Sequence, residues 1–259
     1  MNTHLNHEQT STPLPKLNVV LDLDETLVHA SIAGPSGQSE QSAISQYGTD
    51  PNEARTADCI DIRLHTEKQE LVHVNRRPGL DAFLQAASQE FNLFAFTASE
   101  SFYAHPLLDA LDPKKKYFGD RRLSRNSCTL IGDGRYTKDL CQIALSEMNA
   151  DHQSDEGKHQ KKTTVDDTWF QRTVLVDNNP FSFVPQPKNG IPVVSWYSNP
   201  EDVALNKVYM FLEQLVPLKD VRPHLDATFH VEQTLNKFAQ ANGPQVFQPV
   251  DTNQSFGRR

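Results

Sequence analysis

Three kinds of feature are missing from this sequence of 259 residues, and each absence excludes a class of protein. No apolar run approaches the roughly 20 residues that a membrane-spanning helix requires, so we expect no membrane span. The stretch 1–16 is polar and contains His and Pro, which argues against a signal peptide. The three cysteines form no C-x-x-C pair, so we expect free thiols in a reducing compartment rather than a zinc site.

Charge and length narrow the possibilities further. Acidic residues outnumber basic ones and the formal net charge is −8, whereas non-specific binding to nucleic acid requires a basic surface, so we expect no direct nucleic-acid contact. The length suits one α/β domain with a substantial core and is marginal for two. We predict a flexible lead-in at 1–15, a main domain at 16–225 with surface loops at 33–57 and 149–170, and a C-terminal helix with a polar tail at 226–259.

Hydrophobic periodicity predicts alternating strands and helices in the main domain. Apolar, β-branched runs predict core strands at 17–23, 91–97, 173–177 and 191–196. Alternating apolar and polar residues predict a hairpin at 59–65 and 71–74, and turn signals predict a short antiparallel insert within 117–136. Apolar positions at helical spacing predict helices at 79–90, 100–111, 138–148 and 201–215. This order predicts an α/β fold with a central, mostly parallel sheet flanked by helices.

The most informative segment follows the first predicted strand. The strand ends in two carboxylates, Asp22 and Asp24, and Thr26 comes two residues later. Such a turn places both carboxylates beyond the carboxyl end of a strand, where ligands bind in open α/β sheets. One carboxylate can serve as a nucleophile or metal ligand and the other as an acid or base. Taken alone, the pattern also fits an acidic turn after a buried strand.

Later strands end in the residues that would complete a phosphoryl-transfer site. Thr97 ends the second core strand, Asp177 and Asn178 follow the third, and Lys138 follows the short insert. Because the carboxyl ends of parallel strands meet at one edge of a sheet, we expect these side chains to converge with the two carboxylates of the first strand. Each of them alone has a structural explanation as a turn or a solvated side chain. Their joint occurrence favours phosphoryl transfer.

Such a site needs a nucleophile, an acid, a cation and usually Mg²⁺. Asp22 could attack phosphorus and form an aspartyl-phosphate, while Asp24 could protonate the leaving oxygen and then deprotonate the attacking water. Mg²⁺ prefers oxygen ligands, and the candidates are Asp22, the backbone carbonyl of Asp24, Asn178 and, through water, Asp177. The candidate phosphate ligands are Thr26, Thr97 and Lys138.

The D-x-D-x-T segment resembles the signature of haloacid-dehalogenase-type phosphatases, in which the first aspartate is phosphorylated. From about residue 17 to 225 the chain resembles the small phosphatases of the RNA polymerase II C-terminal domain. The matching segments are 21–29, 77–78, 96–99, 103–104, 126–128, 136–140, 176–180, 189–196 and 220–224. The resemblance implies a haloacid-dehalogenase-like Rossmannoid fold with a small β insert instead of a large cap. It also implies a Mg²⁺-dependent enzyme that acts on phosphoserine or phosphothreonine in protein segments, the polymerase C-terminal domain among them.

The resemblance assigns further residues around the phosphate. Arg125 is implied as a second phosphate contact beside Lys138. An apolar pocket near the hairpin would hold a proline beside the phosphoserine, and its candidate residues are Ile32, Ile62, Leu64, Val72 and Tyr103. Glu100 stands where this family carries an apolar residue. A carboxylate at the rim of the site would repel acidic flanking residues and favour basic ones.

Two other functions fit the same motifs. A mitochondrial inner-membrane translocase subunit shares this domain without the full catalytic set, so a catalytically silent peptide-binding module is one alternative. A phosphatase of a small phosphate ester is the other. The complete catalytic set favours an enzyme, and the absence of a large cap favours a protein segment over an enclosed metabolite. We expect a monomer located inside the cell, in the nucleus or cytoplasm.

Overall fold

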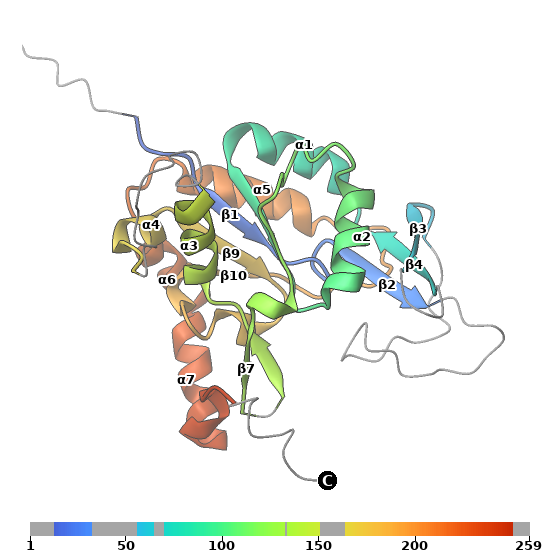
Figure 1. The fold of residues 1–259 in the computed structure, drawn as a ribbon. Coiled ribbons are helices and arrows are strands. Elements are labelled where there is room, and N and C mark those ends of the chain that lie inside the picture. The colour runs from blue at the N-terminus through green and yellow to red at the C-terminus, as the bar shows by residue number, and fades with distance from the viewer. Residues whose placement is uncertain (1–12, 33–55, 65–69, 133, 151–163, 251–259) are drawn as a thin grey trace, which may run out of the picture.

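The computed structural model describes residues 13–32, 56–64, 70–132, 134–150 and 164–250 (Figure 1). Most of the expected lead-in, most of the loop at 33–57, the centre of the loop at 149–170 and the end of the polar tail lie outside these residues. Within the described part of the chain, no helix is long and apolar enough to cross a membrane.

A five-stranded parallel sheet forms the centre of the molecule. Its strands are β1 (Asn18–Leu21), β5 (Asn92–Phe96), β6 (Arg122–Leu123), β9 (Thr173–Asp177) and β10 (Gly190–Pro192). Their order is β10-β9-β1-β5-β6, and every neighbouring pair is parallel. The predicted α/β fold with a central parallel sheet is therefore confirmed. Because β1 lies in the middle, the residues that follow it have a strand end on each side.

Helices cover both faces of this sheet (Figure 1). Val19 and Leu21 of β1 belong to a core formed with α1 (Leu80–Glu90), α2 (Ser101–Leu111) and α5 (Ala204–Leu215). Val20 points to the opposite face and packs with α3 (Leu140–Ala150) and α7 (Val231–Asn242). The continuous apolar run of β1 is explained by burial on both faces. Two shorter helices are α4 (Asp167–Gln171) and α6 (Arg222–Phe229).

Two small antiparallel sheets lie beside the carboxyl edge of the central sheet. One has the order β2-β4-β3 and consists of β2 (Val28–Ile32), β3 (Cys59–Arg63) and β4 (Leu71–Arg76). The other pairs β7 (Thr129–Ile131) with β8 (Arg135–Thr137). The predicted hairpin and the predicted short insert are both present, and β2 is an additional strand. Short 3₁₀ turns complete the list of elements: η1 (Arg125–Ser127), η3 (Pro180–Phe183), η4 (Pro187–Asn189) and η5 (Pro244–Phe247).

The last core strand is shorter than the sequence indicates. The apolar run 191–196 predicts a strand throughout, but β10 ends at Pro192. Val193 still donates its N–H to the carbonyl of Asp177, and Trp196 then donates to the carbonyl of Glu25 instead of a strand neighbour. The chain therefore leaves the sheet at its carboxyl edge and crosses toward the loop that follows β1.

The C-terminal helices belong to the compact part of the molecule. The boundary that we placed at 225 lies inside α6, where Leu225 is buried in the main core. Val231 and Leu235 of α7 pack in the second core with β1 and β5. Helix α4 lies at the end of the segment expected to be a loop, and α3 begins at Leu140, so Lys138 precedes the helix.

Candidate active site

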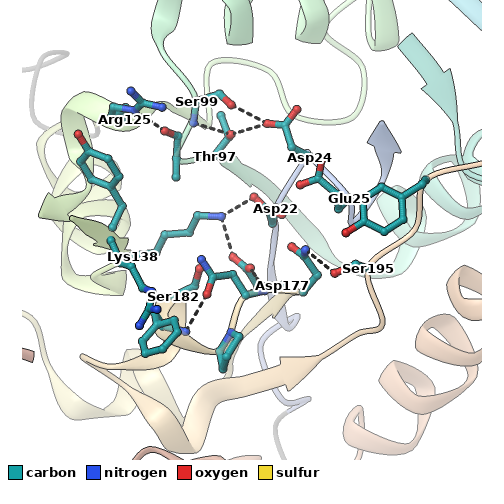
Figure 2. A pocket seen from close by; sticks show the side chains of 18 residues that line it. Asp22, Asp24, Glu25, Thr97, Ser99, Arg125, Lys138, Asp177, Ser182 and Ser195 are labelled. Atoms are coloured by element: carbon teal, nitrogen blue, oxygen red, sulfur yellow. Dashed lines mark hydrogen bonds and ion pairs between the residues drawn. The ribbon is translucent and has the colours of Figure 1, made fainter. Parts of the chain in front are cut away.

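A cavity of about 310 Å³ opens at the carboxyl ends of β1, β5 and β9 (Figure 2). The sequence-predicted residues that line it are Asp22, Asp24, Thr97, Arg125, Lys138, Asp177 and Asn178. They come from five separate stretches of the chain, which meet at the carboxyl edge of the parallel sheet. Arg77 supports this edge from behind, because its buried guanidinium donates to the carbonyl of Thr26 and to both carboxylate oxygens of Asp202.

Asp22 and Asp177 share one buried lysine. The Nζ atom of Lys138 lies 2.5 Å from Oδ1 of Asp22 and 2.7 Å from Oδ2 of Asp177, and the lysine is 2% exposed. Burial alone would lower the pKa of Lys138, but the charges of Asp177 and Asp22 outweigh this effect and raise it. Burial and the charge of Asp22 raise the pKa of Asp177 to about 6, because the single ammonium of Lys138 does not fully offset these two effects. The lysine is therefore held in its charged form against Asp22.

Thr26 fixes the other oxygen of Asp22. Its hydroxyl donates to Oδ2 of Asp22 over 2.8 Å and accepts the backbone N–H of Asn178 over 3.2 Å. The side-chain amide of Asn178 donates to Ser195 over 3.0 Å. Thr26 is fully buried and is absent from the cavity wall, so the expected phosphate contact is replaced by a role in positioning Asp22.

Asp24 has an environment unlike that of Asp22. Its carboxylate accepts hydrogen bonds from three hydroxyls: Thr97 over 3.2 Å, Ser99 over 2.7 Å and Tyr103 over 2.7 Å. Burial and the nearby charge of Asp22 raise the pKa of Asp24, and the three hydroxyls partly oppose that rise. Asp24 is therefore more readily protonated than an ordinary aspartate.

Arg125 borders the cavity and is held by the chain itself. Its Nη1 donates to Oε1 of Glu100 over 3.0 Å, and its Nε donates to the carbonyl of Ala98. The guanidinium also lies 4.9 Å from the ring centroid of Tyr136. Glu100, the residue before α2, does not line the cavity and instead forms an ion pair with Arg125.

The apolar pocket predicted near the hairpin is not found at the expected residues. Ile62, Leu64 and Val72 are at most 4% exposed and belong to the main core. Tyr103 is fully buried, with its hydroxyl on Asp24. The side chain of Ile32 lies outside the described residues. An alternating strand pattern identifies a buried face, and here that face packs on α2 instead of facing a ligand.

Several residues of the cavity wall were not anticipated. They are Glu25, Ala98, Ser99, Arg135, Tyr136, Asn179, Pro180, Phe181, Ser182, Ser195 and Tyr197. Burial raises the pKa of Glu25 to about 6, and its carboxylate lies 3.1 Å from Nδ1 of His29. Glu25, Ser99 and Tyr136 are close in sequence to predicted residues and could have been inferred from that proximity. Tyr197 had no such signal, because its loop reaches the cavity only through the fold.

The parallel sheet with two carboxylates directly after its central strand defines a haloacid-dehalogenase-like fold with a phosphatase-type site. The family model described as NLI interacting factor-like phosphatase matches residues 17–222, and the chain belongs to this family.

Curated relatives agree with this assignment. The CTD small phosphatase-like protein 2 of Dictyostelium discoideum is 34% identical over 223 residues, which are 86% of this chain and 31% of the relative. The nuclear envelope morphology protein 1 of Schizosaccharomyces pombe is 33% identical, over 82% of this chain and 36% of the relative. The human carboxy-terminal domain RNA polymerase II polypeptide A small phosphatase 1 is 32% identical, over 80% of this chain and 62% of the relative. The chain thus spans between 31% and 62% of the length of these relatives.

Among solved structures, the RNA polymerase II CTD phosphatase Fcp1 matches with a TM-score of 0.47 and 20% identity, over 90% of this chain and 57% of that chain.

Proposed function

We propose that this protein is a Mg²⁺-dependent phosphoserine/phosphothreonine protein phosphatase that acts through an aspartyl-phosphate on Asp22. The observation that carries the proposal is the different setting of two carboxylates only two residues apart. Asp22 is held between the charged Lys138 and the hydroxyl of Thr26, whereas the pKa of Asp24 is raised. A nucleophile must be ionised and a general acid must be protonated, so the two settings suit these two roles.

The chemistry takes place in two steps. In the first, a carboxylate oxygen of Asp22 bonds to phosphorus while the bond to the serine or threonine oxygen breaks, and Asp24 gives its proton to that leaving oxygen. In the second, Asp24 takes a proton from water, whose oxygen attacks phosphorus and releases phosphate from Asp22. Lys138, Thr97 and Arg125 border the cavity where the phosphate oxygens would lie. The charge of Lys138 stays beside Asp22 throughout and opposes the repulsion between two anions.

Tyr103 should tune the proton transfer by Asp24. Its hydroxyl donates to Oδ1 of Asp24 and stabilises the ionised form, so Tyr103→Phe should raise the pKa of Asp24 further. Asp24 would then keep its proton to a higher pH, and the pH profile of kcat/KM on a phosphoserine peptide should shift to higher pH. A peptide is needed because its alkoxide leaving group requires a proton, unlike para-nitrophenolate.

Tyr209→Phe is the matched control for this prediction. Tyr209 also donates its hydroxyl to a carboxylate, that of Glu90, but it lies outside the cavity wall. Its removal should leave the pH profile in place. An unchanged profile in Tyr103→Phe, or a shift to lower pH, would contradict the assignment of Asp24 as the acid.

The oxygen donors beside Asp22 suit Mg²⁺. Oδ2 of Asp22 and Oδ1 of Asn178 both lie within 3.3 Å of the same hydroxyl, that of Thr26, so the two candidate ligands are neighbours. Mg²⁺ typically takes one or two carboxylates and keeps several waters. No cluster of three or more His, Cys, Asp or Glu side chains suited to a metal occurs among the described residues, so the proposed site relies on the amide of Asn178 and a backbone carbonyl beside Asp22. When bound through Asp22, Asn178 and the carbonyl of Asp24, Mg²⁺ would offset the charge between nucleophile and phosphate.

The substrate proposal follows from the family and the open site. Two relatives are named as phosphatases of a C-terminal domain, and the name of the human relative specifies the domain of RNA polymerase II. Phosphorylated segments of that domain are therefore the first substrates to test. The described residues contain no large cap domain over the cavity, which favours an extended protein segment over an enclosed metabolite. We propose that the protein acts as a monomer, in the nucleus or the cytoplasm.

A substrate panel tests this function. Purified protein should hydrolyse phosphoserine and phosphothreonine peptides with kcat/KM at least about tenfold above that for small phosphate esters, and chelation should abolish the activity. Faster hydrolysis of small esters would favour the metabolite alternative. Peptide binding without any hydrolysis, with Mg²⁺ present, would favour the silent binding module.

A further inference from the structure

Arg135, the first residue of β8, is a third basic residue on the cavity wall. The two-step chemistry described above does not use it. The other two belong to the chemistry already described: Lys138 contacts Asp22 and Asp177, and Arg125 is the expected second phosphate contact.

Two aromatic rings hold the guanidinium of Arg135. Its Cζ atom lies 4.0 Å from the ring centroid of Phe181 and 5.6 Å from that of Phe238. The two rings contact each other edge to face, with centroids 5.0 Å apart. Stacking uses the flat face of a guanidinium, whose N–H donors lie in its plane and stay directed away from the ring. Because Phe181 also lines the cavity, this positive charge borders the substrate site.

The C-terminal segment 231–250 supports this arrangement. Phe238 lies on α7, and Phe247 of η5 packs 6.1 Å from it, centroid to centroid. Beyond η5, Val250 donates its N–H to the carbonyl of Leu130, and Gln248 accepts the N–H of Gly132. The segment therefore pairs along β7, the partner strand of β8.

Gly132 permits this close approach. A Cβ atom at this position would lie 2.7 Å from the carbonyl oxygen of Val246. The family match ends at residue 222, so the supporting segment lies outside the part of the chain that the family model covers.

We propose that Arg135 binds a second anionic group of the substrate, a phosphate or a carboxylate near the scissile phosphate, and that the segment 231–250 holds Arg135 in place. The inference rests on the proposed function, because it concerns which phosphorylated segments the site selects. A guanidinium forms paired, charge-assisted hydrogen bonds with both kinds of anion. Arg135 is then a specificity residue, and Phe238 positions it.

Matched phosphoserine peptides test the proposal. The neighbouring residues on either side are in turn phosphoserine, glutamate or glutamine, and kcat and KM are measured for each peptide. The wild-type protein should prefer an anionic neighbour over glutamine by about tenfold in kcat/KM, the effect of one charge-assisted hydrogen bond. In Arg135→Gln this ratio should fall to near one, mainly through a higher KM for the anionic peptides. A preference for neighbouring phosphoserine alone would identify the second group as a phosphate. An equal preference for neighbouring glutamate would show that a carboxylate is also accepted.

Two further variants separate recognition from packing. Arg121 is also an arginine beside an aromatic ring, 5.2 Å from that of Phe94, but it does not line the cavity, so Arg121→Gln should keep the wild-type ratio. Phe238→Ala should lower the ratio as Arg135→Gln does, because Arg135 loses one of its rings. Arg135→Lys keeps the charge and should retain part of the preference for anionic neighbours in kcat/KM. Melting temperatures identify any variant that fails to fold.

The outcomes of this inference and of the proposed function are distinguishable. Wild-type hydrolysis without a preference for anionic neighbours, or an equal loss on all peptides in Arg135→Gln, would reduce Arg135 to a packing residue and leave the phosphatase function intact. Absence of hydrolysis by the wild type would contradict the phosphatase function. Dissociation constants of the same peptides for the wild type and for Arg135→Gln would then decide the role of Arg135, because binding needs no turnover.

Discussion

Asp22→Asn should lower turnover of a phosphoserine peptide and of para-nitrophenyl phosphate by about 10³-fold or more, because an amide is a poor nucleophile. The substitution keeps the size of the side chain, and Lys138 keeps Asp177 as a partner, so the fold should survive. The wild-type protein, quenched in acid during turnover, should carry one phosphoryl group by intact mass. The same measurement on the variant should show none.

Asp120→Asn is the control for this loss. Asp120 is an exposed aspartate that pairs with Lys115 at the surface and does not line the cavity, so its substitution should leave turnover unchanged. Turnover of Asp22→Asn within tenfold of the wild type would refute Asp22 as the nucleophile. A phosphoryl group found on the variant would refute it equally.

The convergence of the proposed catalytic residues was predictable because they follow apolar strands. Asp22 and Asp177 each come directly after a run of buried residues, and parallel strands bring such positions to one edge. The place of Lys138 in the site was predictable only from its occurrence together with Asp22 and Asp177, since a single lysine before a helix carries little information. Resemblance then supplied Arg125, whose contact with Glu100 requires the folded loops.

The proposed substrate contacts were harder to predict, for a physical reason. The alternation at Ile62, Leu64 and Val72 identifies a buried face, but a core and an apolar ligand pocket demand the same residues. Arg135 and Phe181 lie 46 positions apart in numbering, and their contact depends on the C-terminal helix that packs against both. Local periodicity carries no information about such a contact.

Lys138→Met should cause the largest loss of stability among single substitutions in the site. The lysine neutralises Asp22 and Asp177, both buried, and methionine would leave two carboxylates close together without a cation. Removing one partner of a buried ion pair costs about 3–5 kcal/mol in the free energy of unfolding. The loss should be measured by denaturant unfolding at pH 8, and turnover should also be lost.

The loss in Lys138→Met should become smaller as the pH falls. The pKa of Asp177 is already raised to about 6 in the presence of the lysine, above its ordinary value of 3.8, and it should rise further without that charge. A carboxylate with a raised folded-state pKa destabilises the fold above that pKa, and the penalty disappears as the pH falls through it. The variant should therefore lie closer to the wild type at pH 5 than at pH 8.

Two comparisons make the Lys138 prediction specific. Lys115→Met removes an exposed lysine from its surface pair with Asp120 and should leave the free energy of unfolding nearly unchanged at both pH values. The double variant Lys138→Met/Asp177→Asn removes one of the two uncompensated charges, so it should be more stable at pH 8 than Lys138→Met alone. An equal loss at pH 5 and pH 8, or a double variant with no recovery, would mean that Lys138 stabilises the fold by packing, because only a charge that offsets Asp22 and Asp177 makes the loss depend on their protonation.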